Sequence, residues 1–499
     1  MADFFEFQEV QEWHDVESFW EDIDYVAQPE EVEQCSSNSS CSIPPLKSAE
    51  ILKNYGSKLK RLRDESSISN QKTIISCLEA MRLAKVRLIQ LNSQKVDVIS
   101  GVKGCFGSIL TSPGFTSDVS EDLEIALLIQ AAAEKISNGQ MVVAKKLINV
   151  CFRTASVTGT PVQRIVYYFA EAFQDRIDQE WGIMSSSEFL AEKTWEKSDA
   201  DYLDRVLVNP ERTATQHEQP YCLVTQFAAT ESILENVASH RRVHLIDFSL
   251  ENGSQWILIM QALAARTEFP LQLLKITAVG TCKPVMEKTG KWLASFAETI
   301  HLPFSFNVVV SDLKSLSRDL FAIEDDEAVA IYSMFRLWTF LPWPNHLRAF
   351  LGVIKSLKPC VMLTRELEVS TASPEFLKRF DELLFFSGAM FDCLNACCEQ
   401  HVEYRKQTEA SFREMIHNTL TAEGAERYQR QEKIAFWRTL FASFGIVESD
   451  LSRLALCQGN LLLKRSDRYA SCSLAMDGKC LIMGWNGTPL ESLSAWKFH

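Results

Sequence analysis

The spacing of hydrophobic and polar residues divides this chain into a helical part and a later part in which short apolar strands alternate with helices. Apolar residues recur at helical spacing over residues 72–91, 119–139, 140–156, 161–179 and 221–239. This spacing predicts helices that each bury one face. Short apolar runs at 243–248, 273–279, 304–310, 328–335 and 360–367 predict strands, and helix-length segments separate most of them. Strands of this kind predict a parallel sheet that is covered on both faces.

The end of the chain predicts an antiparallel addition to that sheet. Long helices are expected over 374–441, and two strand-like segments at 469–476 and 479–485 then flank Asp477-Gly478. Asp-Gly between alternating segments is a strong signal for a two-residue hairpin. We therefore predict an α/β fold: a Rossmann-like, methyltransferase-like and mostly parallel sheet with a C-terminal antiparallel hairpin, plus an α-helical cap.

Changes in composition along the chain predict three regions. Residues 1–46 have the composition of a disordered acidic-aromatic arm and a linker. Residues 47–118 are predicted to be a basic, partly helical connecting segment, in which the glycines at 101, 104 and 107 form a flexible joint. Residues 119–499 are predicted to be one large domain, with a mainly helical cap at 119–240 and an α/β core at 241–499.

The N-terminal arm combines acidic residues with aromatic ones and lacks Lys and Arg over residues 1–33. Acidic residues that alternate with aromatics keep large hydrophobic side chains solvated, as in activation or partner-docking segments. A solvated tail without a specific role is the alternative. The aromatic residues proposed for an activation role are Phe4, Phe5, Phe7, Trp13, Phe19 and Trp20.

A short basic cluster follows the arm and has the composition of a nuclear import signal. An exposed helix face is the alternative interpretation of this cluster. Its members are Lys58, Lys60, Arg61 and Arg63.

Charge and cysteine usage exclude several classes of protein. The formal net charge of -14 argues against a protein whose main role is to bind nucleic-acid phosphates. The 14 cysteines form no CxxC pair and have no His at metal-binding spacing, so we expect reduced thiols, no disulfide framework and no zinc site. The acidic N-terminus is no signal peptide, and no apolar run reaches the roughly 18 residues of a membrane span. We expect a soluble intracellular protein.

Residues 243–256 are the strongest candidate for a ligand site, because ligands of open α/β sheets bind at the carboxyl ends of strands. Nucleotide binding needs several glycines after the first strand and an acid at the end of the next one. The loop after Asp247 offers only Gly253, and residues 278–280 contain no carboxylate. We therefore expect no catalysis, no cofactor and no metal. We assign Asp247 and Gln255 mainly to holding the loop and helix, with ligand contact as the alternative, and His244 to the core.

Four sequence motifs, in a characteristic order, resemble those of the plant GRAS family of transcriptional regulators. Leucine-rich segments at 121–239 and 290–357 flank a VHIID-like motif, and residues 373–392 and 412–441 resemble the PFYRE region. Residues 484–496 resemble the terminal SAW motif. The matching residues are Val243, His244, Leu245, Ile246, Asp247, Gln255 and Trp256 for the first motif and Trp485, Ser494, Ala495 and Trp496 for the last.

This resemblance implies a nuclear regulator without enzymatic chemistry, whose helical cap binds other GRAS proteins and DNA-binding transcription factors. Arg413 and Glu414, at the RE-like position, are expected to pair across the domain, and Trp485 and Trp496 to anchor the core. The chain departs from the family at Ser249, where an acid is frequent, and at Ile257, where proline is frequent, and it has no DELLA sequence. Sequence-specific DNA binding, and a methyltransferase-like enzyme or small-molecule sensor, remain the alternatives.

Overall fold

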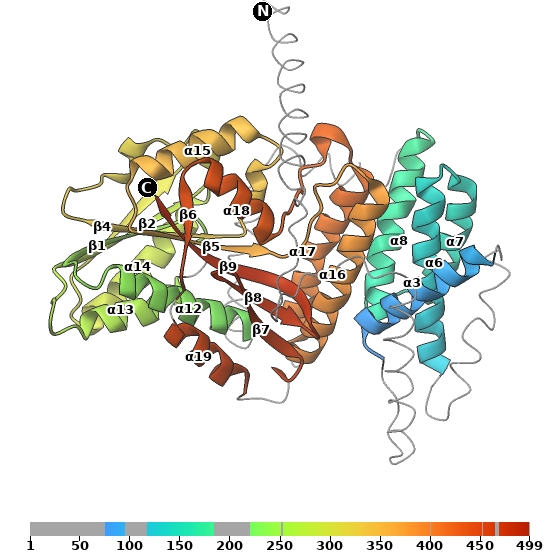
Figure 1. The fold of residues 1–499 in the computed structure, drawn as a ribbon, viewed down its shortest axis with the longest axis horizontal. Coiled ribbons are helices and arrows are strands. Elements are labelled where there is room, and N and C mark those ends of the chain that lie inside the picture. The colour runs from blue at the N-terminus through green and yellow to red at the C-terminus, as the bar shows by residue number, and fades with distance from the viewer. Residues whose placement is uncertain are drawn as a thin grey trace, which may run out of the picture.

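A sheet of nine described strands forms the centre of the α/β part of the molecule (Figure 1). The computed structural model describes residues 75–94, 117–183, 220–250, 253–399, 401–451, 453–464 and 469–498. The strand order is β3-β2-β1-β4-β5-β9-β8-β7, and β6 pairs with β9. The strands are β1 (Arg242–Asp247), β2 (Leu273–Gly280), β3 (Phe304–Val310), β4 (Ala328–Met334), β5 (Val361–Leu367), β6 (Ile446–Ser449), β7 (Cys472–Asp477), β8 (Cys480–Trp485) and β9 (Thr488–Phe498).

The pairing of these strands confirms the predicted fold class. Strands β1 to β5 are mutually parallel, and the predicted hairpin β7–β8 is antiparallel. Strand β9, which the sequence pattern did not reveal, pairs antiparallel with both β5 and β8. Ser494, Ala495 and Trp496 of the SAW-like motif thus lie on the strand that joins the hairpin to the parallel sheet, and Trp485 ends β8.

Helices cover both faces of the sheet (Figure 1). Val243 and Leu245 of β1 pack in the core formed with α13 (Ile257–Ala264) and α14 (Lys283–Thr299). Ile246 faces the opposite way and packs in the core formed with α15 (Pro344–Ser356) and α18 (Ile434–Ser443). This alternation is expected of a strand whose successive side chains point to opposite faces. Helix α12 (Pro220–Asn236) packs against α13 and α19 (Arg453–Leu463).

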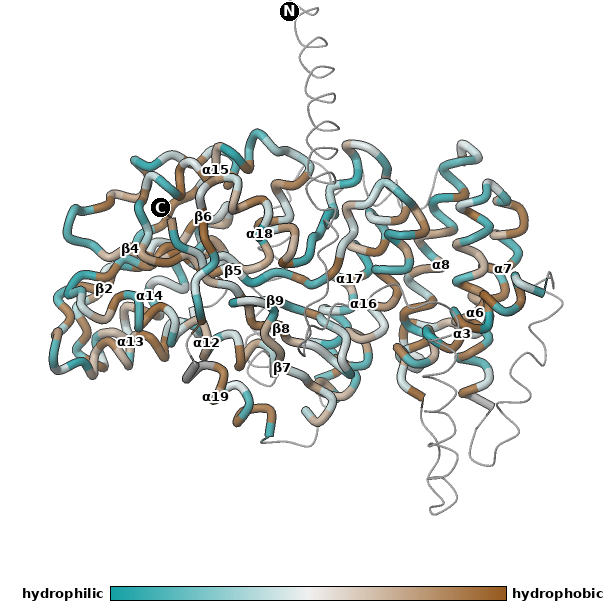
Figure 2. The backbone as a smooth tube through the Cα atoms, viewed as in Figure 1, coloured by the Kyte–Doolittle hydropathy of each residue, from teal (hydrophilic) through white to brown (hydrophobic). Residues whose placement is uncertain are grey.

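The helical cap draws its helices from three stretches of the chain. It contains α3 (Cys77–Ser93), α6 (Ser117–Ser137), α7 (Met141–Thr154), α8 (Pro161–Glu180), α16 (Phe376–Cys397) and α17 (Val402–Thr421). Helix α3 packs against α6 and α16, and α17 packs against α8. The cap therefore also includes helices that precede and follow, in the sequence, the region 119–240 that was expected to form it. In Figure 2, hydrophobic and hydrophilic stretches alternate along these helices, as expected when one face is buried.

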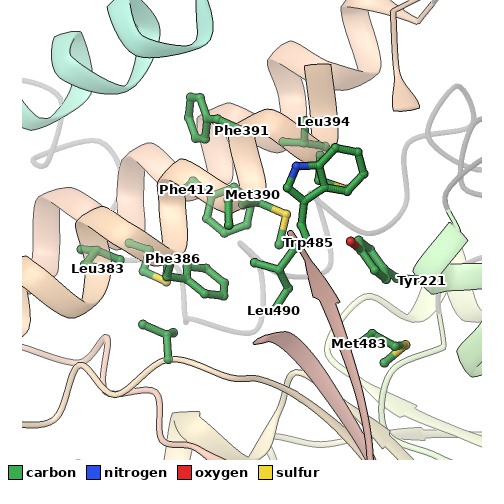
Figure 3. Close-up of a cluster of buried hydrophobic side chains, with 14 of the residues drawn as sticks. Tyr221, Leu383, Phe386, Met390, Phe391, Leu394, Phe412, Met483, Trp485 and Leu490 are labelled. Carbon is green, nitrogen blue, oxygen red and sulfur yellow. The ribbon is translucent and has the colours of Figure 1, made fainter. Parts of the chain in front are cut away.

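One hydrophobic cluster joins the cap to the sheet (Figure 3). Met390 and Leu394 of α16 lie beside Trp485 at the end of β8, and Leu490 of β9 lies in the same cluster. These side chains are all buried. The cap and the sheet therefore share a continuous core, which fixes the cap against the antiparallel edge of the sheet.

Candidate functional site

The carboxylate of Asp247 holds the loop that follows β1. Its Oδ1 accepts a hydrogen bond from the backbone N–H of Ser249 at 2.8 Å. Its Oδ2 accepts bonds from Gln255 Nε2 at 3.1 Å and from the indole Nε1 of Trp256 at 2.8 Å. Asp247 is fully buried. Both carboxylate oxygens are thus engaged by the loop and the start of the next helix.

Several of the chain's own side chains pack at the point where the strand order of the sheet reverses. This point lies between β1 and β4, and in open α/β sheets it is the usual place for a ligand. Trp256 packs edge-on against Tyr332 of β4, with ring centroids 5.5 Å apart. Ser249 Oγ donates to the carbonyl oxygen of Met334 and accepts from its N–H, at 2.9 and 2.7 Å. Ser249 therefore ties the loop to β4.

The loop after β1 also packs closely against α14. Gly253 has a φ of 75°, a conformation that suits glycine. A Cβ atom at this position would lie 2.8 Å from Thr289 Cγ2 and 3.0 Å from Leu293 Cδ1. The single glycine of this loop is thus explained by backbone conformation and by packing against a helix.

His244 belongs to a buried polar cluster near the amino ends of β1 and β4. Its Nε2 lies 2.7 Å from Thr277 Oγ1 and its Nδ1 lies 3.2 Å from Glu327 Oε2. Burial, and secondarily the nearby ammonium of Lys275, lower the pKa of His244 to about 3. Lys275 itself pairs with Glu327 at 2.7 Å. His244 is therefore a neutral core residue whose ring nitrogens both have partners.

Strand β5 carries two adjacent buried ionisable side chains, Arg365 and Glu366, and sequence reasoning missed them. Glu366 accepts hydrogen bonds from the backbone N–H groups of Arg336 and Leu337 at 3.2 and 3.0 Å. Burial raises the pKa of Glu366 to about 8. Arg365 donates from Nε to Glu491 of β9 at 2.8 Å. The adjacent Arg and Glu in an otherwise apolar strand are the sequence signal that could have identified these two residues.

The SAW-like residues are buried in the sheet. The indole Nε1 of Trp496 donates to Thr364 Oγ1 at 3.0 Å and to Ser494 Oγ at 2.9 Å. Its ring packs edge-on against Phe441 of α18, with centroids 4.7 Å apart. Ala495 is fully buried, opposite Leu363 of β5. This motif thus fixes the antiparallel strand against the last parallel one.

Charged pairs join α17 to its neighbours. Arg413 forms a bidentate pair with Glu171 of α8, with both N···O distances at 2.6 Å, on the exposed side of the contact. Glu414 accepts from the hydroxyl of Tyr428 at 2.7 Å. A second pair was not predicted from the sequence: Arg164 of α8 donates from Nε to Glu409 of α17 at 3.0 Å, and both side chains are buried. These pairs hold the two halves of the cap together.

Comparison with known proteins decides the family. The model of the GRAS domain family matches residues 125–497. The chain belongs to the GRAS domain family. Among its curated relatives, DELLA protein GAI1 from Vitis vinifera is 29% identical over 424 residues, which are 82% of this chain and 68% of that protein. DELLA protein RGA from Arabidopsis thaliana is 29% identical over 376 residues, which are 74% of this chain and 61% of that protein.

A solved GRAS structure agrees with the fold. The crystal structure of SCL7 in Oryza sativa matches with a TM-score of 0.61 and 26% identity, covering 81% of this chain and all of that one. These relatives place the chain among the plant GRAS transcriptional regulators. They confirm the resemblance found in the VHIID-like, PFYRE-like and SAW-like motifs.

Within this GRAS domain, the cap exposes an apolar and basic surface on α7. Val142 and Val150 lie two turns apart with exposed fractions of 62% and 40%, and Lys146 and Arg153 are exposed between and beyond them. We call these four residues the α7 face. The opposite side of the helix buries Leu147 and the residues around it. The α7 face is therefore accessible, whereas Asp247 at the strand end is buried and hydrogen-bonded within the chain.

Two of the predicted functional segments fall outside the described residues: the aromatic arm at 1–33 and the basic cluster at 58–63. Over the residues that are described, no group of three or more His, Cys, Asp or Glu side chains is arranged to hold a metal ion. The helices of this same part of the chain include none that is long and apolar enough to cross a membrane.

Proposed function

We propose that this GRAS protein is a nuclear transcriptional regulator that acts through protein partners bound at its cap, rather than through chemistry at its sheet. The expected partners are other GRAS proteins and DNA-binding transcription factors. The observation that carries this proposal is the contrast between the buried, hydrogen-bonded Asp247 at the strand end and the exposed α7 face.

The strand end supports the proposal because its polar groups serve the fold. A catalytic or ligand-binding carboxylate needs a free oxygen that can reach the substrate. Both oxygens of Asp247 instead accept bonds from the chain, and Trp256 lies over the neighbouring strand. The sheet then serves as a scaffold that positions the cap.

The α7 face supports the proposal because it combines exposed valines with cationic side chains. Nearby, Lys145 lies over the ring of Trp181, 4.7 Å from its centroid, and Trp181 is itself exposed. Aromatic residues beside exposed aliphatic ones, with a charged rim, are typical of protein interfaces. The basic residues favour a partner surface that carries acidic groups.

The test uses the purified full-length chain and an immobilised second GRAS protein. The double variant Val142→Asp, Val150→Asp places charges on the α7 face, and we expect binding to weaken by about tenfold or more. The control is Leu461→Asp on α19, because Leu461 is 64% exposed and lies away from the cap. Equal binding by wild type, double variant and control would remove the α7 face from the proposal.

Direct DNA binding is the alternative that the net charge of -14 disfavours. It predicts an affinity that falls steeply with salt concentration, whereas partner-mediated recruitment predicts DNA association only when the transcription factor is present. For localisation, we expect a fluorescent fusion to leave the nucleus when Lys58, Lys60, Arg61 and Arg63 are all changed to Gln. Unchanged nuclear fluorescence would remove that cluster from the proposal.

A further inference from the structure

Four arginines gather around one carboxylate where α8, α16 and the end of α17 meet. They are Arg176, Arg379, Arg427 and Arg430, which we call the arginine cluster. Arg176 Nη1 and Arg379 Nη2 donate to Glu423 Oε1 at 3.0 and 2.8 Å. Glu423 also acts electrostatically on Arg427 and Arg430. Glu423 therefore faces four positive charges, and Glu432 is a second carboxylate that acts on Arg427.

Backbone carbonyls, which carry no net charge, supply most of the remaining partners of the cluster. Arg427 donates to the carbonyl oxygens of Thr371 and Ala372 at 2.6 and 3.1 Å. Arg430 donates to those of Arg427 and Gly424 at 3.0 and 2.7 Å. These bonds explain how the arginines hold the loops around them. They do not neutralise the four positive charges, which the carboxylates of Glu423 and Glu432 offset only in part.

The cluster carries independent signs of that excess charge. Arg427 is buried, and its Nε has no hydrogen-bond partner. Burial, together with repulsion from Arg379 and Arg430, lowers the pKa of Arg427 to about 9. Burial and the charge of Arg379 also lower the pKa of Arg430. Desolvated cations that repel one another favour the binding of an additional anion.

Solvent reaches the cluster at Glu423 and Arg176. The side chain of Glu423 is 51% exposed and that of Arg176 is 21% exposed, whereas Arg379 is fully buried. Arg176 is also held in place by Phe376, whose ring centroid lies 4.7 Å from its guanidinium carbon. An anion arriving from solvent would thus meet Arg176 first and would compete with the carboxylate of Glu423.

We propose that the arginine cluster binds a phosphoryl group carried by a phosphorylated segment of a protein partner. A phosphoryl group brings about -1.5 to -2 charges and three acceptor oxygens, so it matches several guanidinium groups better than one carboxylate does. Glu423 then occupies the site in the absence of the phosphorylated partner. This assignment rests on the proposed function, since it describes how one class of partner is recognised.

The experiment titrates the full-length protein with a phosphoserine peptide, its unphosphorylated form and inorganic phosphate, at constant ionic strength. Glu423→Gln removes the competing carboxylate, and we expect it to tighten phosphopeptide binding by about threefold to tenfold. Arg176→Gln removes the solvent-facing guanidinium, and we expect a loss of about the same size. Thermal melts of both variants establish that they are folded.

The matched control is Glu171→Gln, which frees the single exposed guanidinium of Arg413 on the same pair of helices. We expect this control to leave phosphopeptide affinity within about twofold of wild type. Equal tightening by Glu171→Gln and Glu423→Gln, or no tightening by Glu423→Gln, would overturn the site. Binding of inorganic phosphate without binding of the phosphopeptide would overturn the peptide assignment. The α7-face variant should bind the phosphopeptide normally, so failure here is distinct from failure of the proposed function.

Discussion

Replacing Asp247 by Asn tests whether the strand end is structural. The substitution keeps the size of the side chain and one acceptor oxygen, but it turns the other oxygen into an NH₂ group. In the wild type, Asp247 accepts bonds from one backbone N–H and from two side chains, Gln255 and Trp256. Asn cannot accept all of these bonds, and its NH₂ group faces another donor.

The expected cost follows from the bonds that are lost. A hydrogen bond to a charged group contributes about 1.5–3 kcal/mol, and an unpaired buried donor costs about 1–3 kcal/mol. The removal of a buried charge offsets part of this loss. We therefore expect Asp247→Asn to lower the free energy of unfolding by about 3 kcal/mol.

The assay is urea unfolding followed by tryptophan fluorescence and circular dichroism. The control is Asp381→Asn, which breaks the partly exposed pair with Lys85 at 2.7 Å and should cost less than about 1 kcal/mol. If Asp247→Asn is as stable as wild type, the carboxylate is not needed by the fold. The reasoning would then be refuted, and ligand contact would become the better explanation of this residue.

Four further predictions concern single elements of the molecule. Glu366→Gln should gain stability relative to wild type as the pH rises, because the pKa of about 8 means that folded wild type holds a proton that the unfolded chain loses. In parallel urea titrations, the free energy of unfolding of wild type should fall by about 3 kcal/mol between pH 5 and 8, and an equal pH dependence in the variant would contradict this. Trp496→Ala should cost about 3–5 kcal/mol and abolish partner binding by unfolding the domain, whereas a variant that keeps full thermal stability and loses one partner would show a docking role. Arg164→Met should remove the nearest cation of the buried Glu409, leave the more distant Arg405 Nε at 3.6 Å, and cost about 3 kcal/mol in the same unfolding assay, and a loss below 1 kcal/mol would contradict the buried pairing. Deleting residues 1–33 should spare partner binding and reduce reporter transcription, and unchanged output would remove the arm from the mechanism.

The parallel sheet could be predicted from the sequence because most of its strands are buried on both faces and appear as short apolar runs. Val361–Leu367 and the other parallel strands fall within a residue or two of their predicted ranges. Strand β9 could not be predicted in this way, because Glu491, Ser492 and Ser494 interrupt its apolar pattern. Partners on β5, including Arg365 and Thr364, satisfy these polar groups, and only the folded chain brings them together.

The cap was predicted in part for a related reason. Its helices have clear amphipathic patterns, but the pairing of α8 with α17 depends on Arg164 and Glu409, which are separated by 245 residues. Likewise, Asp392 of α16 accepts bonds from the N–H groups of Cys77 and Leu78 at the start of α3. Local pattern indicates which face of a helix is buried, but it does not identify the distant side chain that will cover it.

The most direct test of the central claim is quantitative affinity purification of the tagged chain from plant nuclei, followed by mass spectrometry. The comparison is among wild type, the double variant Val142→Asp, Val150→Asp and the control Leu461→Asp, each at equal abundance. We predict that GRAS proteins and DNA-binding transcription factors are recovered with wild type and control and are lost with the double variant. An unchanged set of partners in the double variant would contradict the claim that this protein works through its cap.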